Sequence, residues 1–167
     1  MAKSIHHKLF FPHPPEVVWE YLTKAELISE WLMENDFKPI IGHQFQFRSK
    51  PAPQIDFDGI VYCTVLEIIS FKKLSYSWKC GPGNGKITID SIVVWTLIAK
   101  DSGTELLLEN SGFKVMENFA IFSAMDEGWL KHMKRIAENI NAAKIQHVHS
   151  SISYFKKKIT ISTSILH

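Results

Sequence analysis

Histidine is the residue type in this 167-residue sequence that most readily suggests chemistry, and eight are present. Imidazole can act as a base or a metal ligand near neutral pH. His6 and His7 are adjacent in an expected strand, where neighbouring side chains point to opposite faces and cannot share one metal ion. His147 and His149 could share a face, but no acidic residue lies near them. Because a His-Glu-x-x-His segment is also absent, the sequence predicts no metal site.

Two other patterns resemble catalytic or cofactor motifs without matching them. Three residues separate Gly81 from Gly85 where a phosphate-binding loop needs four, and Ile87 stands where that loop needs Ser or Thr. We therefore interpret this segment as a hairpin turn. Cys63 has no basic neighbour that would lower the pKa of its thiol, and no Gly-x-Ser-x-Gly segment exists. The sequence thus predicts no catalytic residue and no cofactor.

Two pairs of acidic residues could supply an acid and a base if burial separated their pKa values. One pair is Asp56 with Asp58, and the other is Asp126 with Glu127. We expect both pairs to be exposed on a turn and on a helix surface. Only Asp58 is kept as a further candidate.

Aromatic and methionine side chains give the more informative pattern, because they gather on single faces of the expected strands and helix. They either fill the core completely or line a pocket that they leave partly open, with Tyr76 and Asn110 as polar anchors. On the second interpretation, the residues that line the ligand-binding cavity are Trp31, Phe45, Phe47, Val61, Cys63, Tyr76, Trp78, Trp95, Asn110, Met125, Trp129 and Met133.

The elements that would position these residues follow from the hydrophobic period. An apolar run ends at the prolines after Phe11, and helical spacing follows from Pro15 and again over Lys24 to Met33. Between Phe37 and Phe113 the period is two, and short polar turns link the expected strands into an antiparallel meander. Residues 117–143 carry apolar positions three or four apart, which predicts a long amphipathic helix across a curled sheet.

These motifs, in this order, resemble the START-like helix-grip superfamily. Within it, the chain is similar to the family of homologues of the activator of the heat-shock chaperone ATPase. The resemblance covers about residues 5–143 and rests on Pro15-Glu16-x-Val18-Trp19, Trp31-Leu32, Leu74-x-Tyr76-x-Trp78, Gly103-Thr104-Glu105-Leu106, Asn110-Ser111-Gly112-Phe113 and Gly128-Trp129-x-x-x-Met133. It implies an α+β helix-grip domain over residues 1–143: a curled antiparallel sheet around a long C-terminal helix, with two short helices after the first strand.

The resemblance implies an interior cavity but no single chemistry, since one fold hosts many functions. We expect binding of a small apolar or amphipathic molecule between the sheet and the final helix. One alternative is an enzyme of the cyclase or dehydratase type. A second is a chaperone-associated interaction protein, a partner expected by resemblance only.

Charge and composition bound the remaining possibilities. The formal net charge of +2 comes from the tail at 144–167, which holds four lysines and no acidic residue, so we expect no nucleic-acid partner. This tail is expected to be an extra strand, exchanged between protomers or not, or a disordered segment. We expect no signal peptide, no membrane span and two reduced cysteines, hence a cytoplasmic monomer or homodimer.

Overall fold

Prolines set the first boundaries in the computed structural model, which describes residues 2–114 and 119–163. Strand β1 (Ala2–Phe11) ends directly before Pro12, and helix α1 (Pro15–Thr23) begins with Pro15 at its first position. A proline is tolerated there because the amide hydrogen that it lacks would have no partner within the helix. Helix α2 (Ala25–Trp31) follows after one residue, so the two predicted short helices are present.

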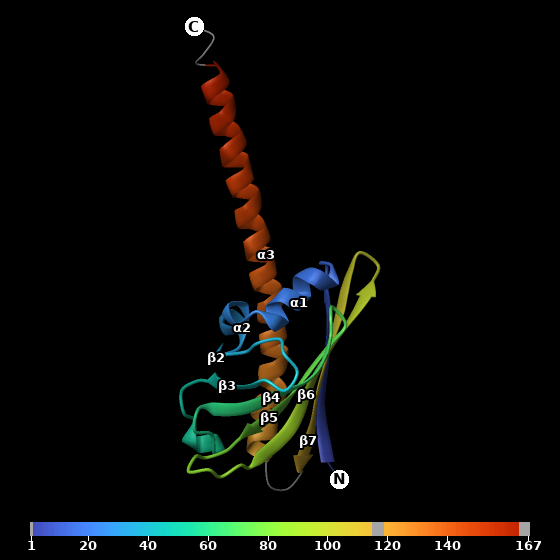
Figure 1. Ribbon diagram of the computed structural model, residues 1–167, viewed down its shortest axis with the longest axis vertical. Coiled ribbons are helices and arrows are strands. Elements are labelled where there is room, and N and C mark those ends of the chain that lie inside the picture. The colour runs from blue at the N-terminus through green and yellow to red at the C-terminus, as the bar shows by residue number, and fades with distance from the viewer. Residues whose placement is uncertain (1, 115–118, 164–167) are drawn as a thin grey trace.

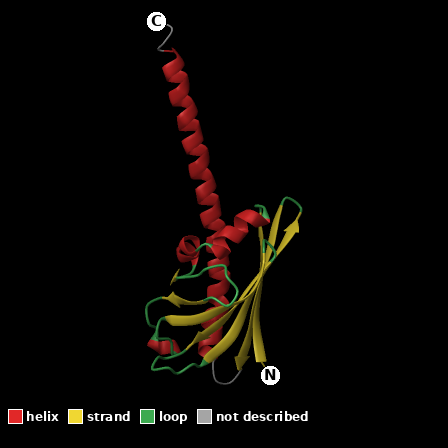
Figure 2. Cartoon of the chain, in the orientation of Figure 1, coloured by secondary structure: helices red, strands yellow, loops and turns green. Residues whose placement is uncertain are grey.

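The described strands form one antiparallel sheet of seven, in the order β1-β7-β6-β5-β4-β3-β2. Its curled shape is visible in Figures 1 and 2. A short 3-10 helix, η1 (Pro53–Ile55), lies in the connection between β3 and β4. After β1, the strands are β2 (Glu34–Asn35), β3 (Gln44–Arg48), β4 (Ile60–Ile69), β5 (Lys73–Cys80), β6 (Ile89–Lys100) and β7 (Gly103–Lys114).

Helix α3 (Phe119–Thr163) crosses the concave face of this sheet with its first half, as Figure 1 shows. Two histidines from the β1 end of the sheet contact it. The imidazole of His7 lies 2.9 Å from a carboxylate oxygen of Asp126, and Nε2 of His13 lies 3.0 Å from Oδ1 of Asn141. The α+β helix-grip fold is therefore confirmed.

The end of α3 corrects one expectation. We expected residues 144–167 to form an extra strand or a disordered tail, but 144–163 continue the helix, and 164–167 lie outside the described residues. Extending an existing helix adds one hydrogen bond for each residue fixed, whereas starting a new element carries the cost of nucleation. No proline or glycine between Trp129 and Thr163 interrupts this extension. Ile159 and Ile161 alternate with polar residues as in a strand, but both lie in this helix.

A buried amide joins the helix to the sheet. Asn110 on β7 is fully buried, and its Oδ1 accepts a hydrogen bond of 3.1 Å from Nε1 of Trp129 on α3. Its Nδ2 donates to Oγ of Ser91 at 3.0 Å and to the carbonyl oxygen of Ile92 at 3.1 Å, both on β6. The amide thus satisfies polar groups that burial would otherwise leave unpaired.

Replacing this amide should destabilise the whole domain. We expect Asn110→Ala to lower the free energy of unfolding by about 3 kcal/mol, since the indole N–H of Trp129 would be left buried without an acceptor. Urea denaturation followed by circular dichroism measures this loss. Glu109→Ala, at the exposed neighbouring position on β7, is the control and should change it by less than about 0.5 kcal/mol. Equal losses for the two variants would contradict the assigned role.

Candidate functional site

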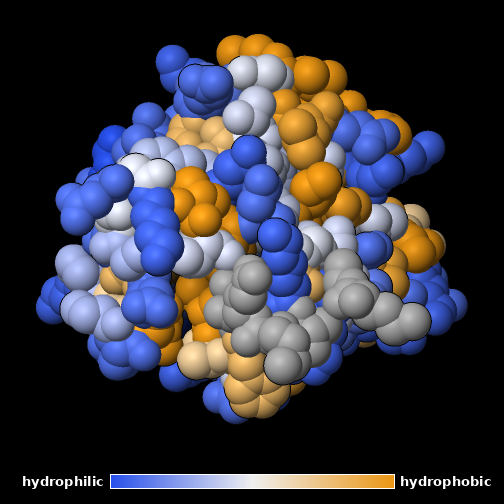
Figure 3. Space-filling view, turned by 90° about the horizontal axis from the view of Figure 1, so that it is seen from below, coloured by the Kyte–Doolittle hydropathy of each residue, from blue (hydrophilic) through white to orange (hydrophobic). Residues whose placement is uncertain are grey.

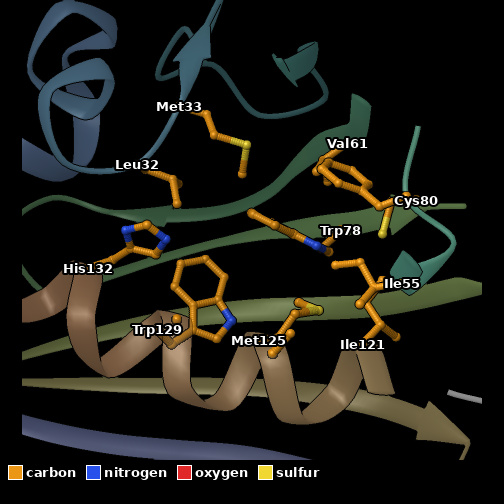
Figure 4. Close-up of a pocket in the computed structure, with 13 residues that line it drawn as sticks. Leu32, Met33, Ile55, Val61, Trp78, Cys80, Ile121, Met125, Trp129 and His132 are labelled. Carbon is orange, nitrogen blue, oxygen red and sulfur yellow. The ribbon is translucent and has the colours of Figure 1, made fainter. Parts of the chain in front are cut away.

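A cavity of about 160 Å³ lies between the first turns of α3 and the wall formed by β4, β5, η1 and the residues after α2 (Figure 4). The wall opposite α3 consists of Leu32, Met33, Ile55, Phe57, Val61, Trp78 and Cys80. Helix α3 contributes Ile121, Ala124, Met125, Gly128, Trp129 and His132. The lining is thus almost wholly apolar, as is usual for sites that take small organic molecules.

Contacts among tryptophan side chains stiffen the wall of the cavity at Trp78 and Trp129. The rings of Trp78 and Trp129 meet edge to face with their centroids 5.0 Å apart, and the rings of Trp95 and Trp129 meet in the same way at 5.6 Å. Aromatic pairs in this arrangement are favourable beyond the area that they bury. The indole of Trp129 is also held by its hydrogen bond to Asn110, so these contacts restrict the movement of this part of the wall.

Gly128 contributes to the space in the cavity. A Cβ atom added to it would meet only Nε2 of His132, at 4.0 Å. This position in the helix therefore has open space where most residues would place a side chain. Met33 and Met125 extend toward the cavity from opposite walls (Figure 4), and their flexible thioether chains can adjust to a guest's shape.

His132 is the one imidazole among the cavity-lining residues, and it lies at one end of the cavity (Figure 4). Burial lowers the pKa of His132 below 6.5, and the charges of Arg135 and Lys131 act in the same direction, while a backbone hydrogen bond at Trp31 opposes them. The ring is therefore neutral at pH 7. Its Nδ1 atom is buried and has no hydrogen-bond partner of its own.

The cysteines offer no nucleophile. Burial, reinforced by the charge of Asp58, raises the pKa of the Cys80 thiol to about 12, and burial also raises the pKa of Cys63. Both thiols are free and buried. A thiol with such a pKa stays protonated at neutral pH, and the thiolate is the reactive form.

Of the twelve side chains predicted to line a cavity, Val61, Trp78, Met125 and Trp129 line this one. The other eight are buried in the hydrophobic core or its hydrogen bonds instead, and their contact with a ligand stays a prediction; they are Trp31, Phe45, Phe47, Cys63, Tyr76, Trp95, Asn110 and Met133.

Internal hydrogen bonds occupy the two expected polar anchors. The hydroxyl oxygen of Tyr76 accepts from Nε1 of Trp95 at 3.0 Å, and Asn110 is engaged as described above. The carboxylate candidates also lie elsewhere. Oδ1 of Asp58 accepts from the backbone amide of Ile60 at 3.0 Å, and Asp126 pairs with His7.

His132, Ile55 and Phe57 line the cavity but were not predicted from the sequence. His132 follows Met125 and Trp129 at the spacing i, i+4, i+7, which places all three on one helix face. This spacing was the available signal for His132. For Ile55 and Phe57 no such signal exists, because they lie in and just after η1 and not in a periodic element.

Figure 3 shows the molecule from below the view of Figure 1. On this face, hydrophobic residues form separate groups between hydrophilic ones. Within the described residues, no three His, Cys, Asp or Glu side chains come close enough to hold a metal ion. No helix among those residues is long and apolar enough to cross a membrane.

Comparisons with known proteins identify a family and several solved structures that this chain resembles. The family model described as Activator of Hsp90 ATPase homolog 1-like protein matches residues 12–141. Protein MLL2253 from Mesorhizobium loti is 31% identical with a TM-score of 0.75, over 84% of this chain and 98% of that one. Protein BH1534 from Bacillus halodurans is 26% identical with a TM-score of 0.64, over 83% and 96%.

The Aha1 dimer from Colwellia psychrerythraea, at 16% identity, has the same fold, with a TM-score of 0.67 over 83% of this chain and 96% of that one. A comparison with curated proteins gave no match.

The lowered pKa of His132 predicts how stability depends on pH. As the pH falls below about 6.5, the unfolded chain takes up a proton on this residue before the folded protein does. The free energy of unfolding should therefore fall until the pH reaches the folded-state pKa of His132. In His132→Gln the difference between unfolding free energies at pH 7 and pH 5 should be smaller than in the wild type. The exposed His147→Gln is the control, and an equal reduction in both variants would contradict the assignment.

Proposed function

Because the chain belongs to the family of Activator of Hsp90 ATPase homolog 1-like proteins and has the helix-grip fold, we propose that it binds a small hydrophobic or amphipathic molecule in the cavity beside α3. The observation that carries this proposal is the cavity itself, with rigid apolar walls and one imidazole at its end. The volume of about 160 Å³ suits a guest with an apolar part about the size of a benzene ring.

The energetics of packing support a guest. Burial of a guest's apolar surface gains about 25 cal/mol for each Å² removed from water. Here the tryptophans are held by ring contacts and hydrogen bonds and do not collapse into the space.

His132 would orient the guest. A neutral imidazole has one nitrogen that donates and one that accepts, so it can pair with a hydroxyl or a protonated carboxyl group. The Nε2 atom lies on the side of Gly128, which itself lines the cavity. A molecule with a small apolar body and one such polar group therefore fits the site better than a hydrocarbon alone.

The same imidazole is compatible with a second candidate function, catalysis of the cyclase or dehydratase type. Such a reaction needs a group that can accept a proton inside the cavity, and a neutral imidazole can do this. The lining residues include no carboxylate that could act as its partner. For this reason binding is the function that we favour. Interaction with a chaperone and a cytoplasmic location stay predictions.

Titration with a matched pair of probes tests the proposal. Toluene and 4-methylphenol share the apolar body and differ by one hydroxyl. We expect a saturable change in tryptophan fluorescence with both, because Trp78 and Trp129 line the cavity, and tighter binding of 4-methylphenol. Absence of a saturable change with either probe would contradict the proposal.

Filling the cavity from within gives the second test. In Gly128→Leu the new side chain enters the cavity, so we expect the affinity for 4-methylphenol to fall at least about tenfold, equivalent to 1.4 kcal/mol. The variant should remain folded, since leucine favours a helix over glycine by about 1 kcal/mol. Isothermal titration calorimetry measures the affinity. Glu127→Leu adds the same side chain at an exposed position in the same turn and should bind as the wild type does.

A further inference from the structure

The second half of α3 projects from the domain (Figure 1). Among the side chains of α3 that the structure describes, Ile140 is the last buried one, at 3% exposure, and all side chains over 141–158 are exposed. At 1.5 Å per residue, the helical segment 144–163 is about 30 Å long. This segment also lies beyond residues 12–141, which the family model matches.

Large apolar side chains follow this projecting segment along one line. Ile145, Val148, Ile152 and Phe155 are each at least half exposed, from 50% to 64%. Their spacing of three, four and three residues is that of the a and d positions of a coiled coil, with isoleucine at both a positions. We name these four residues the seam.

The seam is narrow. At 3.6 residues per turn its four residues lie within about 80° of the helix circumference, and the opposite face carries residues such as Gln146 and Ser150. A stripe restricted to a and d positions is typical of a coiled coil, whereas a helix lying on a membrane needs a broader apolar face. Its occupant is therefore another helix.

The seam also points away from the chain's own sheet. Trp129, Met133, Ile136 and Ile140 pack into the domain, and the seam is rotated from their face by about a third of a turn. A second helix can thus approach the seam without meeting the domain from which this helix emerges.

A second copy in parallel orientation avoids contact between the lysines beside the seam. In that arrangement Lys144 faces His149 of the partner subunit and Ser151 faces Lys156 of the partner subunit, so lysine does not face lysine. An antiparallel pair centred on the same segment would bring Lys144 against Lys158. Isoleucine, which occupies both a positions here, is found at the a positions of parallel two-stranded coiled coils.

We propose that the projecting half of α3 is a self-association site, where two copies of this chain form a parallel two-stranded coiled coil along the seam. The proposal is independent of the ligand cavity. It places both domains at the same end of the pair, so both cavities stay accessible.

Light scattering after size-exclusion chromatography of the full chain tests this proposal. We expect the mass of a dimer for the wild type and of a monomer for Ile152→Lys, which buries a charge in the seam. Ser153→Lys adds the same charge one residue away, outside the seam, and should remain a dimer. Near-ultraviolet circular dichroism confirms that each variant keeps its folded domain. A wild-type monomer at all concentrations tested, or a dimer that persists in Ile152→Lys, would overturn the proposal.

A cysteine variant tests the orientation. In a parallel pair Ile145→Cys meets its own copy and should form a disulfide between subunits, seen as a dimer on a non-reducing gel. The native cysteines, Cys63 and Cys80, are buried and do not compete. A dimer without this disulfide would overturn the parallel arrangement. A monomer that binds vesicles of phosphatidylglycerol would identify an anionic lipid surface as the occupant and overturn self-association.

Discussion

The contact of Trp129 with the sheet is the interaction on which the rest of this structure depends. Its indole contacts the rings of Trp78 and Trp95, and its N–H is held by the buried amide of Asn110. The burial of apolar surface alone does not select one position of the helix on the sheet, since the hydrophobic effect is non-directional. The hydrogen bond from Trp129 to Asn110 fixes the register of α3 on β7.

Fixing the helix in this register also creates the cavity. Directly before Trp129, Gly128 lines the cavity and presents no side chain to occupy the space. The space remains open because the surrounding rings are held in place by other partners. The same rigidity keeps His132 at the end of the cavity, where burial makes its imidazole neutral at pH 7.

The first half of α3 gains its stability from this packing, and the second half has no such support from the domain. Residues 144–163 remain helical as an extension of a helix already formed, and the side chains of Ile145, Val148, Ile152 and Phe155 are exposed. Exposed apolar residues at regular helical spacing are a feature that a partner helix can bury. One continuous helix therefore joins the domain with the cavity to the proposed self-association segment.

Local pattern predicted most of the strands, the two short helices and the first part of α3, because alternation and helical spacing follow directly from backbone geometry. It did not predict β2 or the continuation of α3 to Thr163. Trp78 and Trp129 were nevertheless predictable as neighbours across the core. The position of the cavity was not, since Ile55 and Phe57 come from an irregular connection and Tyr76 and Asn110 are occupied by bonds to distant residues. Whether side chains fill a space or leave it open depends on how several distant elements pack together, and only the tertiary structure decides this.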